Sequence, residues 1–360
     1  MRAALSTAVA VCAITAVLPA AASAEPTAVA GRLGAGVERI SVAADGTLAD
    51  NNSAGASITH NGQRIVFSSS AKNLTPGGAT GDDRVYVRDQ RTGQFKRMGD
   101  LTPLQPPVIS GDGEYVAYSL RWMKNVRVRQ YQVSTGWTAS VNCSAYSCNQ
   151  PSLSADGQHT ALAILIKQPL SPEHQRIEVQ DWNTGGTKAT VAELGHTYPS
   201  RPSISGDGRY VAYQDGEAED VFVWDRTSGT TSGPIEGPSA GAALVQLSND
   251  GSKVVYLSGS DTYVHDVHSG TAQLVPNVRG VAIDPTGRYL LYAPYNTNGA
   301  SLTLRDLQTG TDEIVANQPA SAGTDAVSAG GRDVVFQSTA GDIVPGDTNG
   351  KSHIYVRHFS

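Results

Sequence analysis

The sequence predicts an all-β protein assembled from seven copies of one repeat. A short stretch around a turn glycine recurs along the chain, a second stretch that ends in another glycine follows most copies, and apolar residues alternate within both. The first set of turn glycines lies about 45 residues apart on average, which is the spacing of four-stranded propeller blades. These glycines are Gly62, Gly113, Gly157, Gly208, Gly251, Gly287 and Gly331.

One repeat is clearest in residues 204–229, ISGDGRYVAYQDGEAEDVFVWDRTSG. A first strand leads into the Asp-Gly turn, a second strand covers 210–213, a third covers 221–224, and a fourth follows the turn that ends at Gly229. An Asp-Gly dipeptide flanked by alternating apolar residues is typical of a β-hairpin. No stretch beyond the N-terminal segment has a sustained helical period, so we expect each repeat to form four short strands.

The two ends of the array predict a closed ring. The seventh repeat stops after its third strand, HIYVRHFS, while a spare strand at 37–42 precedes the first repeat. If the spare strand completes the last blade, six whole blades and one split blade close on themselves and leave no open sheet edge. The sequence therefore predicts a single seven-bladed β-propeller of four-stranded blades over residues 37–360, preceded by a flexible segment at 25–36.

The N-terminus has the pattern of a signal peptide over residues 1–24. Arg2 precedes an apolar run at 8–18 that is too short to span a bilayer, and Ala22, Ser23 and Ala24 form a small-residue cleavage site. No later segment is apolar for long enough to cross a membrane. We therefore expect a secreted or extracytoplasmic protein that is cleaved near Ala24.

Charge and cysteine content limit the classes of partner and cofactor. The formal net charge of −6 argues against nucleic acid, because nucleic-acid binding needs a clustered basic surface. Cys143 and Cys148, in NCSAYSCN, lie beyond the leader, and in an oxidising compartment a local disulfide between them is expected. A zinc site is the alternative, but two thiols without nearby histidines do not complete a zinc tetrahedron.

Two patterns that look catalytic are better explained by the fold. GPSAG at 237–241 matches the G-x-S-x-G pattern of serine hydrolases, but it lies in a connection between blades and no helical pattern follows it. Aspartates also recur four residues before the second turn glycine, where each can accept hydrogen bonds from N–H groups of its own turn. They are Asp89, Asp181, Asp225, Asp266 and Asp306. We expect both patterns to be structural.

The chain resembles the TolB-like repeats of the WD40-like propeller group, of the secreted actinobacterial type. The resemblance rests on the S-x-D-G-x-Y-V-A-Y stretches at 110–118 and 205–213, and on two longer elements at 68–89 and 344–357. It implies a propeller over nearly all of the chain after the leader. TolB itself carries an additional N-terminal α/β domain that has no counterpart in this sequence, so its role in envelope assembly is not transferred.

The candidate ligand-binding residues lie in the loops that differ most between repeats. These are the loops between second and third strands and between blades, which share one end of the propeller, and variable loops on a rigid scaffold commonly carry binding residues. Aromatic, amide and cationic side chains there suit a sugar, a carboxylate or a peptide. They are Arg121, Trp122, Lys124, His196, Tyr198, Tyr295 and Asn296. Packing of Trp122 under a neighbouring loop is the alternative interpretation.

One loop is acidic and has two interpretations. It contains Asp215, Glu217, Glu219 and Asp220. Oxygen-rich clusters suit calcium, so a calcium site is one interpretation. A solvated acidic loop is the other, and it is favoured because the spacing does not match a calcium-binding loop. No other cofactor is expected.

No part of the sequence assembles a nucleophile, a base and an orienting group. The predicted function is therefore an exported, monomeric, non-catalytic propeller scaffold that binds a protein or a cell-envelope glycan through its variable-loop face. The alternative is an extracellular carbohydrate-active enzyme similar to the propellers of polysaccharide lyases, which would need a funnel bearing histidines and a metal. The histidines are spread over several blades, which leaves that alternative open.

Overall fold

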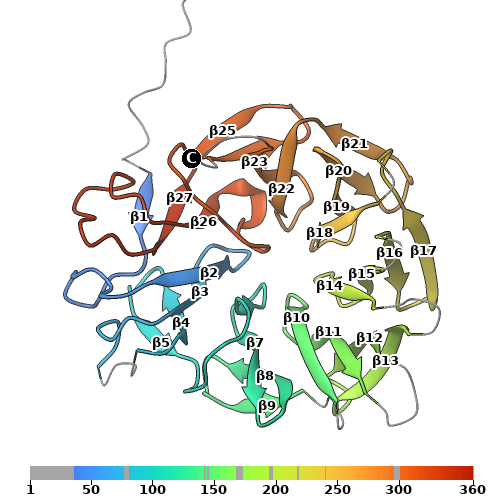
Figure 1. The fold of residues 1–360 in the computed structure, drawn as a ribbon, viewed down its shortest axis with the longest axis horizontal. Helices are drawn as coiled ribbons and strands as arrows, with labels where there is room; N and C mark the ends of the chain where they lie inside the picture. The colour runs from blue at the N-terminus through green and yellow to red at the C-terminus, as the bar shows by residue number, and fades with distance from the viewer. Residues whose placement is uncertain are drawn as a thin grey trace, which may run out of the picture. The chain divides into compact units, whose positions relative to one another are not determined.

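Seven antiparallel sheets, arranged in sequence order around a common axis, make up the computed structural model of the protein (Figure 1). The structure describes residues 36–76, 81–141, 143, 146–167, 173–193, 198–216, 219–239, 241–295 and 301–359. All of these residues lie in the unit Leu33–Ser360. The predicted all-β, seven-bladed propeller is confirmed. The predicted signal peptide lies outside the described residues, as does the predicted flexible segment apart from Gly36.

Blades 1 to 6 are four-stranded sheets in which each strand pairs with the next along the chain. Blade 1 consists of β2 (Ser53–Ile58), β3 (Arg64–Ser69), β4 (Arg84–Asp89) and β5 (Phe95–Arg97). Blade 2 consists of β6 (Val108–Ile109), β7 (Tyr115–Trp122), β8 (Asn125–Gln132) and β9 (Thr138–Ser140). Blade 3 consists of β10 (Ser147–Leu153), β11 (His159–Ile166), β12 (His174–Asp181) and β13 (Thr187–Ala192).

The remaining blades follow the same order. Blade 4 consists of β14 (Ser200–Ile204), β15 (Tyr210–Gln214), β16 (Val221–Asp225) and β17 (Thr230–Ile235). Blade 5 consists of β18 (Ala243–Leu247), β19 (Lys253–Ser258), β20 (Asp261–Asp266) and β21 (Ala272–Val275). Blade 6 consists of β22 (Val278–Ile283), β23 (Tyr289–Pro294), β24 (Leu302–Asp306) and β25 (Asp312–Ala316). Blade 7 contains β26 (Asp333–Ser338), β27 (His353–His358) and β1 (Val37–Arg39).

The split seventh blade confirms the predicted ring closure. β1 pairs antiparallel with β27, so the N-terminal strand is the outer strand of the last blade. Regular pairing ends at Arg39, earlier than the predicted strand end at residue 42. The reason lies in the next two residues: the N–H of Ile40 still bonds to the carbonyl of Ile354 (2.7 Å), but the N–H of Ile354 bonds to the side-chain oxygen of Ser41 (3.0 Å).

The inner strand of blade 7 is irregular. Two isolated bridges, Ser321↔Gln337 and Val327↔Val334, take the place of a continuous ladder. Between them the backbone of Asp325 has a φ of 57°, in the left-handed region, and its carbonyl accepts a hydrogen bond from the N–H of Ile58 in blade 1 (2.9 Å). One turn of 3₁₀ helix, Ala329–Gly331, follows. Within the described parts of the chain, no helix has the length and apolarity to cross a membrane.

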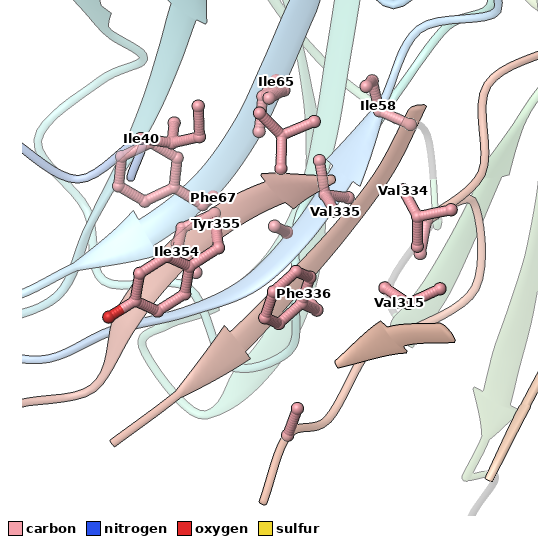
Figure 2. Close-up of a cluster of buried hydrophobic side chains, with 14 of the residues drawn as sticks. Ile40, Ile58, Ile65, Phe67, Val315, Val334, Val335, Phe336, Ile354 and Tyr355 are labelled. Carbon is pink, nitrogen blue, oxygen red and sulfur yellow. The ribbon is translucent and has the colours of Figure 1, made fainter. Parts of the chain in front are cut away.

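Packing between blades explains the burial pattern of the strands. A middle strand such as β15 is buried at consecutive positions because both faces of its sheet contact other blades, whereas the outer strand β17 is exposed along most of its length. Figure 2 shows the core where the ring closes: Ile40 lies beside Phe67 of blade 1 and Tyr355 of blade 7, and all three are fully buried. Burial of such side chains contributes about 1.5–3 kcal/mol each.

Candidate functional site

The end of the propeller that carries the Asp-Gly turns is tied together by backbone hydrogen bonds between blades. The bonded N–H and C=O pairs are His60 to Gly111 (3.1 Å), Asp112 to Ala155 (2.9 Å), Ala155 to Gly206 (2.9 Å), Gly206 to Asn249 (2.7 Å), Asp250 to Pro285 (3.0 Å) and Ala329 to His60 (2.9 Å). The imidazole of His60 also lies against Gly111, where an added Cβ would come within 2.3 Å of the ring. The backbone groups of these turns therefore join the blades to one another.

The central cavity is lined by the inner strands of all seven blades and has a volume of about 30 Å³. A cavity of this size holds one or two water molecules but not a sugar ring. Its serines are used in bonds between blades: Ser152 Oγ accepts from the N–H of Ile204 (3.1 Å) and Ser203 Oγ accepts from the N–H of Leu247 (3.0 Å). They are structural hydroxyls.

Two titratable side chains face this cavity. Asp325 accepts a hydrogen bond from Gln246 Nε2 (2.7 Å), and the protein that surrounds its carboxyl group raises the pKa to about 6 by desolvation. Burial lowers the pKa of His60, against the opposing charges of Asp112 and Asp284. Near neutral pH the imidazole is therefore neutral.

The recurring aspartates lie in the turns as predicted. Asp225 Oδ1 accepts from the N–H of Thr227 (2.8 Å), and the Arg209 guanidinium, which pairs with this carboxylate, lowers its pKa to about 2. Asp89, Asp181, Asp266 and Asp306 accept bonds from the same turn positions. Ser239, in GPSAG, lies in a turn between β17 and β18. These residues serve the fold.

The β7–β8 hairpin of blade 2 is long and has a strained tip. The two strands pair over eight residues, from Tyr115↔Gln132 to Trp122↔Asn125, compared with five pairs between β15 and β16 in blade 4. Met123 and Lys124 form the two-residue turn. The φ of Met123 is 54°, a conformation that usually selects glycine or asparagine, and its side chain is 84% exposed. The predicted residues Arg121, Trp122 and Lys124 lie at this tip and are exposed.

A notch of about 330 Å³ lies beside the tip, on one face of the blade 2 sheet. Side chains alternate along strands, and the register places Leu120 opposite Arg127 and Arg129 opposite Ser140, so the lining residues share a face with Trp122. The guanidinium carbon of Arg129 lies 5.2 Å from the centre of the Trp122 ring. Arg121, which adjoins Trp122 in sequence, belongs to the opposite face. The cation that stacks on the indole is therefore Arg129.

Arg127 and Arg129 were not among the predicted site residues, although the sequence contains a signal for them. Residues 115–155 include no aspartate or glutamate, while the whole chain has more acidic than basic residues. The four cations of that segment are Arg121, Lys124, Arg127 and Arg129. Two of them alternate along β8 at a spacing that places them on one face. The segment is a local basic surface on an acidic protein.

The structure does not bring all of the predicted binding residues together. Tyr198, between blades 3 and 4, is 40% exposed and donates its hydroxyl to the carbonyl of Glu173 (3.0 Å). Tyr295 directly follows β23 and is 44% exposed. Strand β23 lies across the ring from the β7–β8 hairpin (Figure 1). His196 and Asn296 lie outside the described residues. The predicted set therefore divides between separate blades.

The predicted calcium residues lie in the loop after β15. The N–H of Asp215 bonds to the carbonyl of Asp220 (2.8 Å), which closes the loop, and the φ of Glu219 is 54°. Glu217 lies outside the described residues. In the described part of the chain, no three side chains of His, Cys, Asp or Glu gather closely enough to hold a metal ion. Calcium binding at this loop stays one of the two interpretations, and the solvated acidic loop stays the favoured one.

The predicted disulfide between Cys143 and Cys148 is present, and both half-cystines are buried. It ties the end of the connection after β9 to the start of β10. The same segment supports the hairpin, because Arg127 Nη1 donates to the carbonyl of Tyr146 (2.6 Å) and the N–H of Val126 donates to Ser147 Oγ (3.1 Å). Cys143 also lines the notch. The disulfide therefore anchors one wall of the site.

Comparison with known proteins gives matches at the level of structure. No protein-family model matches the chain, and no curated protein matches it. An oligogalacturonate lyase in complex with manganese is similar over 90% of this chain and 93% of its own, with a TM-score of 0.65 and 13% identity. The oligogalacturonate lyase of Vibrio parahaemolyticus has a TM-score of 0.66 and 12% identity over the same shares. The likeness is one of fold.

A further solved structure, TolB from Acinetobacter baumannii, matches with a TM-score of 0.48 and 16% identity over 75% of this chain and 64% of its own. The two lyase structures, at 12–13% identity, support the propeller fold alone, and the resemblance to secreted actinobacterial TolB-like repeats stays a prediction. The function must therefore be argued from the residues of this chain.

Proposed function

We propose that the protein is an exported, non-catalytic β-propeller scaffold that binds a protein or a cell-envelope glycan through its variable-loop face. The observation that carries this proposal is the tip of the β7–β8 hairpin, where Met123 is 84% exposed on a backbone with a φ of 54°. An exposed apolar side chain on a strained turn of a rigid scaffold supports contact with a partner. Trp122, at 45% exposure, extends the same surface.

Export is supported by two features of the chain. The signal-peptide pattern of residues 1–24 directs secretion, and the Cys143–Cys148 disulfide is of the kind that persists in an oxidising compartment. A partner of the envelope or of the extracellular space is consistent with both.

The lyase alternative shares the fold of the oligogalacturonate lyases, one of which contains manganese. One observation favours the binding scaffold: the central cavity of about 30 Å³ does not admit a sugar ring. Wild type and the variants His174→Ala and His196→Ala should release no unsaturated sugars from acidic glycans. Release that these variants abolish would support the lyase instead.

The binding proposal is tested with Met123→Gly in the full exported chain. Glycine adopts a φ of 54° without strain, so the variant should fold with unchanged or higher stability. It removes the exposed side chain, and capture of the partner from envelope extract or on a glycan array should fall about tenfold, a loss of about 1.4 kcal/mol.

Asn277→Gly is the matched control, because Asn277 is another non-glycine residue in the left-handed region (φ 55°), in the loop between β21 and β22 on the same face. It should leave capture unchanged. If Met123→Gly and wild type capture the partner equally well, the hairpin tip is not part of the binding surface. If the wild-type chain retains no envelope protein or glycan, the proposed binding function is contradicted.

A further inference from the structure

The notch beside the hairpin tip has a composition that suits one class of ligand. Its lining combines an exposed indole, two guanidinium groups and a hydroxyl: Trp122, Arg127, Arg129 and Ser140. A flat aromatic surface binds the apolar face of a sugar ring, and guanidinium groups bind carboxylate and phosphate through paired hydrogen bonds. The volume of about 330 Å³ lies at the lower end of small-molecule pockets, which suits a single sugar residue rather than a long chain segment.

Arg129 differs from the other described arginines that lie over aromatic rings in whether a carboxylate of the protein lies near the guanidinium group. Seven arginines lie over aromatic rings there, and five of them also pair with a carboxylate of this chain. The pairs are Arg39 with Asp347, Arg88 with Glu38, Arg209 with Asp225, Arg288 with Asp306 and Arg305 with Asp312. A sixth, Arg357, has Glu313 as a charged neighbour.

Arg129 has no carboxylate partner among the described residues, and its own segment, 115–155, contains no acidic residue that could supply one. The Arg129 guanidinium is thus positioned by the Trp122 ring and has no anionic partner among the described residues. At the other six arginine–ring contacts the protein itself provides an acidic neighbour. At the notch, a ligand can provide it.

We infer that the notch is a subsite for one anionic sugar residue of an acidic glycan. The sugar ring stacks on the exposed part of the Trp122 indole, and its carboxylate or phosphate pairs with Arg129. Arg127, fixed by its bond to the Tyr146 carbonyl, adds a second positive charge. The inference rests on the proposed binding function and names the class of glycan that the variable-loop face takes.

The test measures binding to the full exported chain by calorimetry and by Trp fluorescence. Three probes are used: an oligouronate, its neutral methyl ester, and a poly(glycerol phosphate) chain. Binding of the oligouronate or of the phosphate chain, with the methyl ester at least about tenfold weaker, is the expected result, and the preferred anion identifies the source of the ligand. Equal binding of the ester, or binding of neither anion, overturns the inference.

Variants locate the site. Arg129→Gln removes the charge and should weaken anion binding about tenfold or more, while Arg129→Lys, which keeps the charge but not the paired geometry, should recover part of the affinity. Trp122→Ala should weaken it similarly and Trp122→Phe less. Arg305→Gln is the matched control, because Arg305 also lies over a ring, Tyr292, but already pairs with Asp312.

The outcomes separate the subsite from the wider function. Unchanged anion affinity in Arg129→Gln overturns the subsite. If no anionic saccharide binds but partner capture still depends on Met123, the subsite fails while the binding scaffold stands. If the correctly folded wild-type chain binds no anionic saccharide and captures no partner, both proposals fail.

Discussion

Asp325 lies in an environment that is unfavourable for a charged side chain. Its backbone is in the left-handed region, its carboxyl group is surrounded by protein, and its hydrogen-bond donors are the side chain of Gln246 and no cation. A carboxylate that is desolvated without a positive partner destabilises the folded state once it ionises. The folded pKa of about 6 lies above the ordinary value of 3.8, so the fold is favoured by protonation at this position.

Asp325→Asn should therefore change the pH dependence of stability. The raised pKa contributes stability that is complete below about pH 4 and is lost as the pH rises through about 6. Asparagine keeps an oxygen that can accept from Gln246 and carries no charge. The variant should match wild type at pH 4 and exceed it by roughly 2 kcal/mol at pH 8, in urea unfolding at both pH values. An advantage that does not grow with pH would contradict the assignment.

Blades are joined by side chains that no single repeat specifies. Glutamine side chains accept from the N–H groups of inner strands in other blades: Gln105 from Gln150 (3.2 Å), Gln150 from Arg201 (2.8 Å), Gln214 from Leu244 (3.2 Å) and Gln337 from Gly55 (2.7 Å). Each bond satisfies an N–H left unpaired where the inner strand bulges. At the opposite end of the propeller, contacts between turn residues, such as His60 with Gly111, also join adjacent blades.

Gly111→Ala tests the contact between blades 1 and 2. The new Cβ would lie 2.3 Å from the His60 ring, so the imidazole must move, and the variant should lose about 1–3 kcal/mol of stability in chemical denaturation. His60→Ala should restore most of that loss in the double variant. Gly323→Ala is the control, since nothing lies within 4 Å of its added Cβ and its φ is not positive. Equal stability of the two alanine variants would show that the contact contributes nothing.

The whole ring is closed by a buried polar network around β1 and β27. His353, fully buried, bonds through Nδ1 to Ser41 Oγ (3.0 Å) and through Nε2 to Asn349 Oδ1 (3.0 Å), and Arg39 pairs with Asp347 (3.5 Å). Because Asn349 Oδ1 only accepts, Nε2 carries the proton and Ser41 donates to Nδ1. Burial lowers the His353 pKa, which agrees with a neutral ring. A serine, a histidine and an aspartate thus meet in the protein interior, and all three are buried.

Ser41→Ala should weaken this closure. It leaves the N–H of Ile354 and Nδ1 of His353 without partners, at a cost of about 1–3 kcal/mol, and amide exchange should accelerate first in β1 and β27. Ser228→Ala, which removes an exposed hydroxyl bonded to Thr230, should stay within about 0.5 kcal/mol of wild type. A uniform loss of amide-exchange protection across all blades would contradict a local role for Ser41 in the pairing of β1 with β27.

The sequence by itself determined the features that depend on neighbouring residues. The turn glycines, the aspartates that accept from their own turns and the alternation of apolar residues act within a few positions, so their repetition predicts the strands and the seven blades. The split closure was predicted by counting strands at the two ends of the chain, and the pairing of β1 with β27 confirms it. The Cys143–Cys148 disulfide has the same local character, since five positions separate the two residues. These predictions hold because backbone conformation and short-range hydrogen bonding do not depend on distant parts of the chain.

Only the tertiary structure decided which side chains act together. Trp122 was predicted as a binding residue, but hairpin register, and not adjacency in sequence, makes Arg129 its cation. The raised pKa of Asp325 comes from desolvation by the protein around the central cavity, whose lining residues come from all seven blades. Contacts between blades arise from the packing of whole sheets against each other. The repeat pattern therefore does not predict which side chains of different blades come together.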